Sequence, residues 1–254
     1  MSGSKDRVIG VVSAVPSEGE SIASRLKPLE RRAVGPLRSY RGKAGGREIV
    51  YVISGIGKTN AAHATALLAR EYPLSLVIGF GIGGAYPGKG LKVGDVAVAT
   101  KEVYADEGVL LKDGFHPLNM IRIPLVRLAR RRLFNEFPLD RRLSRAALRS
   151  SRHIVNAKSG AFNTVSLCTG TETRAKELSE RFGAICENME GAAVAHLCSL
   201  YEVPFVEMRG ISNIVEERDI RKWDIGLAAE NCQKALLEFL SSLDGTIERG
   251  ECLI

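Results

Sequence analysis

The feature that most constrains the fold is a regular alternation between short apolar segments and segments with a helical pattern. The run RVIGVVSA at 7–14 is almost continuously apolar, which is typical of a strand buried on both faces. Further strands are expected at 47–55, 74–80, 93–101, 164–170, 183–187 and 204–212, and helices at 17–29, 58–72, 172–182, 189–201 and 224–243. Strands that alternate with helices predict an α/β fold with three layers, in which helices cover both faces of a central mixed, mainly parallel sheet.

The 254 residues contain no low-complexity linker and no internal repeat, so one domain spanning 1–254 is expected. The five cysteines are odd in number and never spaced C-x-x-C, which favours reduced thiols over disulfides or a zinc site. The chain has no apolar run of about 18 residues and no signal-peptide pattern at its start. These patterns predict a cytoplasmic protein with no metal ion and no membrane partner.

Nine arginines lie between Arg127 and Arg152 and contribute strongly to the net charge of +7. One interpretation is a nucleic-acid-binding patch. The favoured interpretation is the solvated face of helices, because leucines form an apolar stripe in the same segment and no regular pattern of aromatic residues interleaves the arginines to stack on bases. Attraction of a small anionic substrate is a third possibility.

Residues 79–84, GFGIGG, match the G-x-G-x-x-G pattern of a dinucleotide-binding turn. That turn requires a helix that opens at the third glycine, because the helix N-terminus holds the pyrophosphate. Pro87, Gly88 and Gly90 disfavour a helix here, and the segment VGDVAVAT that follows is strand-like. The pattern therefore predicts no NAD or FAD cofactor, and the glycines need another explanation.

Polar residues follow the expected strands at positions where ligands collect in α/β sheets. Glu18 or Glu20 follows the first strand, Glu190 begins a helix, and Arg209 and Asn213 lie at and after the end of the last strand. Taken singly, each of these residues could instead cap a helix or form a structural ion pair. Together, two carboxylates, an arginine and an amide at one sheet edge indicate a candidate active site.

Four segments occur in the order found in the nucleoside phosphorylase and nucleosidase superfamily: RVIGVVSAVPSEGE, SGIGKTNAA, VIGFGIGGAYPGKGLKVGDV and NMEGAAVAHLCSLYEVPFVEMRGISN. The resemblance covers nearly the whole chain and is weakest in the arginine-rich middle. ENMEGAA, RGISN and RDIRKWDI further resemble the futalosine hydrolase family. This resemblance implies hydrolysis of the N-ribosidic bond of futalosine, with release of hypoxanthine and dehypoxanthine futalosine in menaquinone biosynthesis. It also implies a homo-oligomer without a cofactor, which uses water as the nucleophile.

The resemblance assigns a role to each candidate residue. Glu18 matches the carboxylate that activates water as a general base. Glu190 matches the residue that binds the ribose hydroxyls, and its charge would stabilise the positive charge that develops on the sugar. Met189 matches a residue that packs against the ribose, and Arg209 matches the cation that helps hold the water and its carboxylate partner.

Two positions depart from the pattern of the relatives. Asn213 replaces an aspartate of the adenine-specific members, and its NH₂ group suits N7 and the 6-oxo group of hypoxanthine, although an amide is no general acid. Ile82 replaces a hydroxyl that binds phosphate or water, which favours hydrolysis over phosphorolysis. The neighbouring Gly81, Gly83 and Gly84 would let the backbone approach the ribose closely.

Other assignments rest on position alone. Thr169 and Thr171 match a segment that faces the base, whereas Trp223, with Arg218 in a lid, would stack on the purine or pack in a core. Phe115 and His116 lie in a region that could hold the benzoate-containing tail of futalosine.

The alternatives within the class are a nucleosidase for methylthioadenosine and S-adenosylhomocysteine, a nucleosidase for 6-amino-6-deoxyfutalosine, and a purine nucleoside phosphorylase. The alternatives outside it are a nucleotide-binding oxidoreductase and a basic nucleic-acid-binding protein.

Overall fold

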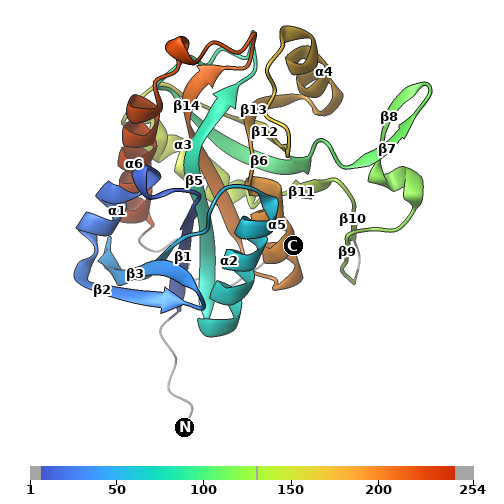
Figure 1. Cartoon of the computed structure of the whole chain (residues 1–254). Coiled ribbons are helices and arrows are strands. Elements are labelled where there is room, and N and C mark those ends of the chain that lie inside the picture. The colour runs from blue at the N-terminus through green and yellow to red at the C-terminus, as the bar shows by residue number, and fades with distance from the viewer. Residues whose placement is uncertain (1–6, 130, 244–254) are drawn as a thin grey trace.

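The computed structural model describes residues 7–129 and 131–243 of the 254-residue chain. Its centre is a ten-stranded sheet with the order β11-β6-β12-β13-β5-β1-β4-β3-β2, in which β14 pairs with both β5 and β6 (Figure 1). One of the five cysteines, Cys252, lies outside the described residues. The single domain over 1–254 stays a prediction.

The sheet is mixed. The strands β4 (Arg47–Ile53), β1 (Val8–Ser13), β5 (Leu74–Ala85) and β14 (Phe205–Ile214) pair in parallel, as do β6 (Val96–Tyr104), β12 (Ala157–Thr164) and β13 (Ala184–Asn188). Antiparallel pairings connect these two groups and add the edge strands β3 (Leu37–Ala44), β2 (Lys27–Val34) and β11 (Glu136–Pro138). Two small ribbons, β7 (Gly108–Leu111) with β8 (Gly114–Pro117) and β9 (Val126–Arg127) with β10 (Arg132–Leu133), lie outside the sheet.

Helices cover both faces of the sheet, each over its own apolar core. On one face α2 (Lys58–Glu71) packs against α5 (Gly191–Leu200), and their residues join one buried cluster with Val12 and Val77. On the other face α3 (Arg141–Arg152) packs against α6 (Ile225–Ser242) over a second cluster that includes Val11 and Ile78. Val11 and Val12 point to opposite faces because side chains alternate along a strand, so β1, which is buried along its whole length, is covered on both faces. The three-layer α/β class is therefore confirmed.

The remaining helices lie at the periphery. Helix α4 (Glu172–Phe182) packs on β12 and β13, and α1 (Glu20–Arg25) contacts α6. Short 3₁₀ turns cover Pro16–Glu18, Leu118–Ile121 and Ile220–Lys222. No helix in the described part of the chain is long and apolar enough to cross a membrane.

Three expected elements differ from the structure. The helix expected at 17–29 is limited to α1, because Pro28 is incompatible with a helix interior and the chain instead enters β2. The strand expected at 164–170 lies earlier in the chain. The observed strand β12 covers Ala157–Thr164, and residues 166–170 form a loop. The strand expected at 74–80 is longer in the structure, because β5 runs through the glycines of 79–84 to Ala85. The expected absence of a helix after Gly84 is confirmed, since the next regular element is β6.

The arginine-rich segment does not form one surface. Arg127 and Arg132 lie on the β9–β10 ribbon, which contacts α5, whereas the arginines of α3 lie on the helix layer of the opposite face. Helix α3 buries Leu143 and exposes Arg141, Arg145 and Arg149. The two groups of arginines are separated by the sheet, which favours a solvated helix over a continuous nucleic-acid patch.

Candidate active site

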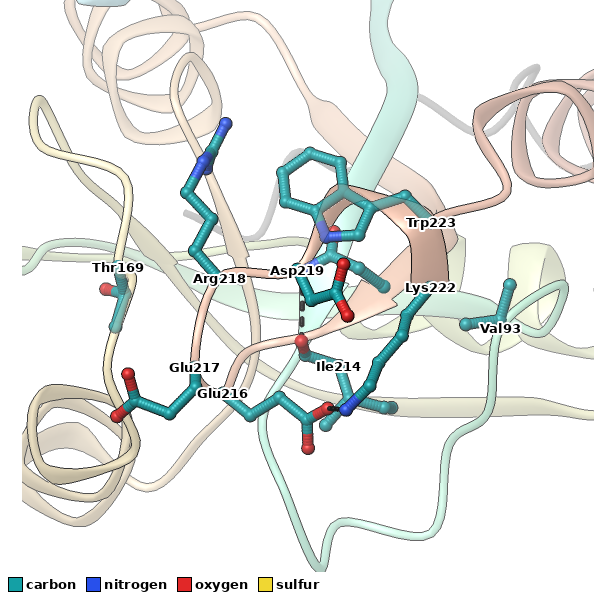
Figure 2. Close-up of a pocket in the computed structure, with 10 residues that line it drawn as sticks. Val93, Thr169, Ile214, Glu216, Glu217, Arg218, Asp219, Lys222 and Trp223 are labelled. Atoms are coloured by element: carbon teal, nitrogen blue, oxygen red, sulfur yellow. Dashed lines mark hydrogen bonds and ion pairs between the residues drawn. The ribbon is translucent and has the colours of Figure 1, made fainter.

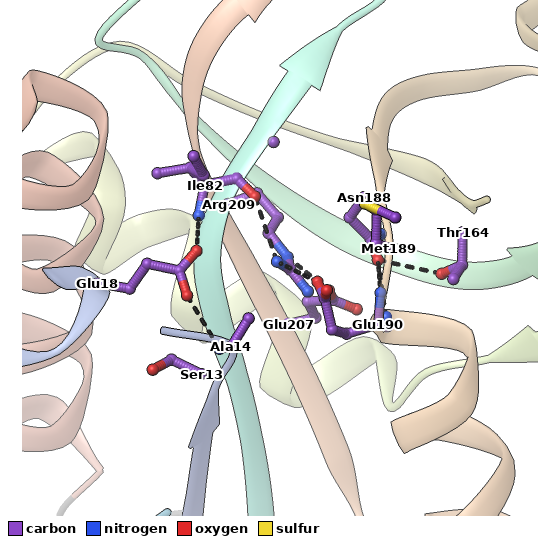
Figure 3. Close-up of polar contacts among 12 residues, drawn as sticks. Ser13, Ala14, Glu18, Ile82, Thr164, Asn188, Met189, Glu190, Glu207 and Arg209 are labelled. Carbon is purple, nitrogen blue, oxygen red and sulfur yellow. Dashed lines mark hydrogen bonds and ion pairs between the residues drawn. The ribbon is translucent and has the colours of Figure 1, made fainter. Parts of the chain in front are cut away.

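A buried group of charges lies where β1, β5 and β14 approach the start of α5. Figure 3 shows Glu18, Glu190 and Arg209 pointing toward one another from three separate elements. Their exposed fractions are 3%, 6% and 3%. Charged side chains are almost never buried to this extent unless they are paired, so each must be explained by its partners.

Glu18 is fixed by backbone donors at the end of β1. Its Oε2 accepts hydrogen bonds from the backbone N–H groups of Ala14 and Val15 at 2.9 and 3.1 Å, and its Oε1 accepts one from Ile82 at 2.9 Å. Burial raises the pKa of Glu18 above its ordinary value, although the charge of Arg209 and the backbone hydrogen bonds act in the opposite direction. A carboxylate that is held in place and made more basic by burial suits a general base.

Glu190 occupies the N-cap position of α5. Its Oε1 accepts a hydrogen bond from the backbone N–H of Gly57 at 2.9 Å, and its Oε2 accepts one from Arg209 Nη1 at 3.1 Å. The helix N-terminus is capped by Asn188, whose Oδ1 accepts from the N–H groups of Glu190 and Gly191. This arrangement leaves the Glu190 carboxylate free to face the site instead of capping its own helix.

Arg209 links the carboxylates. Its Nε donates to Glu207 Oε1 at 2.8 Å, and its Nη1 donates to Glu190 and, at 3.2 Å, to the carbonyl of Ile82. Burial acts to lower the pKa of Arg209, but the charges of Glu207, Glu190 and Glu18 outweigh this and raise it. Arg209 is therefore cationic at any working pH.

The glycines of β5 form the floor between these groups. Gly81 pairs with Arg209 in the register of β5 and β14. A Cβ atom on Gly81 would lie only 2.4 Å from Glu18 Oε1 and 3.1 Å from Arg209 Nη1. Glycine is required here because any side chain would occupy the space that the two charged groups share.

A pocket lies beside this cluster, at the end of β14 (Figure 2). It contains three of the expected substrate-binding or catalytic residues, Thr169, Asn213 and Trp223, and is lined further by Val93, Ile214, Glu216, Glu217, Arg218, Asp219 and Lys222. The carboxylates Glu18 and Glu190 do not line it. Asn213 lies four residues after Arg209 on the same strand, so the pocket and the charge cluster occupy neighbouring stretches of β14.

Asn213, Thr169 and the pair of Arg218 with Trp223 have defined contacts at the pocket. Asn213 Oδ1 accepts a hydrogen bond from Ser212 Oγ at 2.8 Å, and its Nδ2 donates to the carbonyl of Ile214 at 3.2 Å. Thr169 donates from its backbone N–H and from Oγ1 to Glu187, at 2.9 and 2.5 Å. The guanidinium of Arg218 lies 4.7 Å from the centre of the Trp223 ring, which holds the indole at the pocket by a cation–π contact.

Other expected residues lie elsewhere or have other partners. Thr171 caps α4 by accepting from the N–H of Arg174. Phe115 lies on the β7–β8 ribbon, which projects from the body of the molecule (Figure 1), and its ring contacts the guanidinium of Arg181. His116 pairs with Asp113. Within one chain the structure brings none of these three expected residues into the charge cluster.

Met189 is half-buried, and its Sδ lies 3.3 Å from Cys168 Sγ in the 166–170 loop. Of the two carboxylates that follow β1, Glu18 enters the cluster, whereas Glu20 begins α1 and is exposed.

Glu207, Glu102, Asn188 and Gly57 were not among the expected site residues. One signal for Glu207 was available, because residues two apart in a strand share a face and Glu207 precedes Arg209 by two positions in VEMRG. Asn188 also had a signal, because it lies just before a helix, where asparagine is a preferred cap. Glu102 and Gly57 come from distant parts of the chain and leave no local pattern. Among the residues that the structure describes, no group of three or more His, Cys, Asp or Glu side chains is arranged to hold a metal ion.

The comparisons with known proteins agree with this architecture. The chain is 38% identical to the futalosine hydrolase of Thermus thermophilus over 200 residues, which cover 79% of this chain and 84% of that protein. It is 28% identical to the 5'-methylthioadenosine/S-adenosylhomocysteine nucleosidase of Psychromonas ingrahamii, with 93% and 99% of the two chains covered.

Solved structures show the same fold. The 5'-methylthioadenosine/S-adenosylhomocysteine nucleosidase of Neisseria meningitidis, in complex with methylthio-immucillin-A, superimposes with a TM-score of 0.81 at 28% identity and covers 93% of this chain and 100% of that chain. The model of the phosphorylase superfamily matches residues 8–241, which include every element from β1 to most of α6. The chain therefore belongs to the phosphorylase superfamily.

Proposed function

We propose that the protein hydrolyses the N-ribosidic bond of a purine nucleoside. The observation that carries this proposal is the pairing of two buried carboxylates with different surroundings around one arginine. Glu18 is held by three backbone N–H groups, whereas Glu190 is held by one N–H group and by Arg209. Two carboxylates whose environments differ can take two roles in glycoside cleavage.

In the proposed mechanism, Glu18 accepts a proton from a water molecule that attacks the anomeric carbon. Glu190 binds the ribose hydroxyls and stabilises the positive charge that develops on the sugar. Arg209 orients Glu190 through a hydrogen bond and acts on Glu18 through its charge, and Met189 packs against the ribose. The 3% exposed fraction of Glu18 supports its use as a base, because burial removes the competing solvation of the charged form.

Hydrolysis is proposed over phosphorolysis. A phosphate ion needs several free donors, but the backbone N–H of Ile82, at the position where relatives place a hydroxyl, already donates to Glu18. The Glu18 carboxylate would also repel an anion at that point. The nucleophile that fits the site is therefore neutral water.

For the substrate we propose futalosine, with hypoxanthine and dehypoxanthine futalosine as products in menaquinone biosynthesis. Asn213 supports a 6-oxopurine, because its NH₂ group donates one hydrogen to the carbonyl of Ile214 and keeps the other for N7 or the 6-oxo group. The 38% identity with the Thermus thermophilus futalosine hydrolase supports the same choice. Because an amide cannot serve as a general acid, the base leaves as an anion stabilised by hydrogen bonds or takes its proton from water.

A second candidate is a nucleosidase for methylthioadenosine or S-adenosylhomocysteine. It is favoured by the relatives of that activity that match 93% of this chain. In this case the oxygen of Asn213, which already accepts from Ser212 Oγ, would have to accept from the 6-amino group through its second lone pair.

The test is to incubate the purified protein with futalosine, inosine, adenosine and methylthioadenosine, with and without phosphate, and to identify the released base by chromatography. Release of hypoxanthine from futalosine without phosphate is expected. Preferential release of adenine would favour the second candidate, and strict dependence on phosphate would contradict hydrolysis. We also propose a homo-oligomer in the cytoplasm, and light scattering of the purified protein measures the oligomeric state.

A further inference from the structure

Behind the candidate site lies a buried carboxyl pair that the mechanism does not use. Glu207 on β14 and Glu102 on β6 are both fully buried, with exposed fractions of 0%. Glu207 uses one oxygen, Oε1, to accept from Arg209 Nε. Its other oxygen, Oε2, is buried and has no donor among the described residues as long as Glu102 is ionised.

Glu102 already has two donors of its own. Its Oε2 accepts from Thr164 Oγ1 at 2.7 Å, and its Oε1 accepts from Asn188 Nδ2 at 2.8 Å. These donors belong to the group that caps α5, since Thr164 Oγ1 also accepts from the N–H of Ala192. Glu102 is thus fixed in place by the same residues that fix the start of α5.

The two carboxyl groups face one point. Glu102 Oε1 and Glu207 Oε2 each lie 2.3 Å from the position that a Cβ atom on Gly191 would occupy, so the two oxygens lie close together. Two ionised carboxylates cannot hydrogen-bond to each other, because an ionised carboxylate only accepts. One proton between the two groups would give the buried Oε2 of Glu207 the donor that it otherwise lacks.

We propose that Glu102 carries this proton and donates it in a hydrogen bond to Glu207, and that Glu207 as a carboxylate positions Arg209 between Glu18 and Glu190. The assignment of the proton follows from the partners. Glu207 faces a guanidinium, which favours a charged carboxylate, whereas Glu102 faces two neutral groups. Burial, as the largest cause, and the charge of Glu207, as the second, raise the pKa of Glu102 well above its ordinary value. This direction agrees with the assignment of the proton to Glu102.

The pair sets the charge that Arg209 presents to the site. Other titratable groups that face Arg209 or the pair are Glu18, Glu190, Tyr104, Cys186 and Cys232. Burial raises the pKa of both thiols, that of Cys232 to about 11, so they stay neutral at working pH. The local charge is then that of Arg209 against three carboxylates, and Glu207 is the only one of the three that lies away from the proposed substrate.

Two variants separate the roles of the pair. In Glu102→Gln the amide donates to Glu207, so the negative charge stays next to Arg209. In Glu207→Gln the amide oxygen still accepts from Arg209 and the NH₂ group donates to Glu102, but the negative charge next to Arg209 is lost, and burial still favours the protonated form of Glu102. Glu230→Gln, in an exposed pair with Lys234 on α6, is the matched control.

The proton is tested by infrared difference spectroscopy on the intact protein at neutral pH. A band of a buried protonated carboxyl group is expected in the wild type, in Glu230→Gln and in Glu207→Gln, and it should be absent in Glu102→Gln. This measurement needs no substrate, so it stands even if the proposed nucleosidase activity fails. A wild type without the band, or a Glu102→Gln variant that retains it, would overturn the shared proton.

The positioning role rests on the proposed function and is tested by the pH profile of nucleoside cleavage. Glu207→Gln is expected to lower kcat by about 10- to 100-fold, the size of one charge-assisted hydrogen bond, and to move the acidic limb of kcat/KM to lower pH. The shift has this sign because Arg209, relieved of Glu207, stabilises ionised Glu18 more strongly. In Glu102→Gln, kcat should stay within a few-fold of the wild-type value, and the acidic limb of kcat/KM should stay at the same pH. Equal losses in both variants without a shift of the limb would reduce the pair to a structural role and overturn the proposal.

Discussion

Replacing Glu190 by glutamine tests the proposed chemistry most directly, because the change removes a charge and preserves the shape. Glu190 is 6% exposed, and its two oxygens accept separately from Gly57 and Arg209. A glutamine can keep only one of these hydrogen bonds, since its NH₂ group must face a donor. The variant therefore loses the negative charge and part of the positioning of the side chain.

The magnitude follows from Coulomb's law. A carboxylate about 4 Å from a unit positive charge on the sugar contributes about 4 kcal/mol at an effective dielectric constant of about 20. Loss of this stabilisation in the transition state corresponds to roughly a thousandfold decrease in rate. Because the same carboxylate is proposed to bind the ribose hydroxyls, KM for the nucleoside should also rise.

The assay is steady-state release of the purine base, quantified by chromatography, with thermal unfolding measured on the same samples. The control is Glu230→Gln, which removes a carboxylate from an exposed ion pair and should leave kcat/KM unchanged. A folded Glu190→Gln variant with kcat/KM within about tenfold of the wild type would refute the assignment of Glu190 to charge stabilisation.

Three further predictions concern the base, the packing and the specificity. Because burial raises the pKa of Glu18 and the base must be ionised, kcat/KM should fall with decreasing pH at a point above the ordinary glutamate range, and a flat profile down to about pH 4.3 would contradict this. Gly210→Ala should lower the free energy of unfolding by about 1–3 kcal/mol or more in chemical denaturation, because the new Cβ would lie 2.0 Å from the backbone oxygen of Ala228. The control is Gly226→Ala, whose new Cβ would lie 3.7 Å from its nearest neighbour, Asp224 Oδ1. Asn213→Asp should raise the ratio of adenine to hypoxanthine released from the matching nucleosides, and an unchanged ratio would show that Asn213 does not select the base.

The location of the candidate site could be predicted because its two carboxylates follow strands. Glu18 comes shortly after β1 and Glu190 begins α5, and the carboxyl ends of parallel strands converge. Arg209, expected at the end of a strand, lies in the middle of β14. The local conformation was harder to predict. GFGIGG contains the glycines of a turn, yet it continues β5 because its backbone pairs with β14 on one side and with β13 and β1 over parts of its length.

The sequence by itself determined the layers of the fold and the strand ends where charged groups would gather. It could do so because apolar periodicity and strand–helix alternation are local properties. Only the tertiary structure decided which charges meet. Glu102 and Glu207 lie more than 100 positions apart, and what joins them is the placement of β6 beside β14. Such a contact depends on the packing of the whole sheet, so no segment of the sequence carries a signal for it. The sequence therefore predicts which residues could perform the chemistry, and the packing determines their charge.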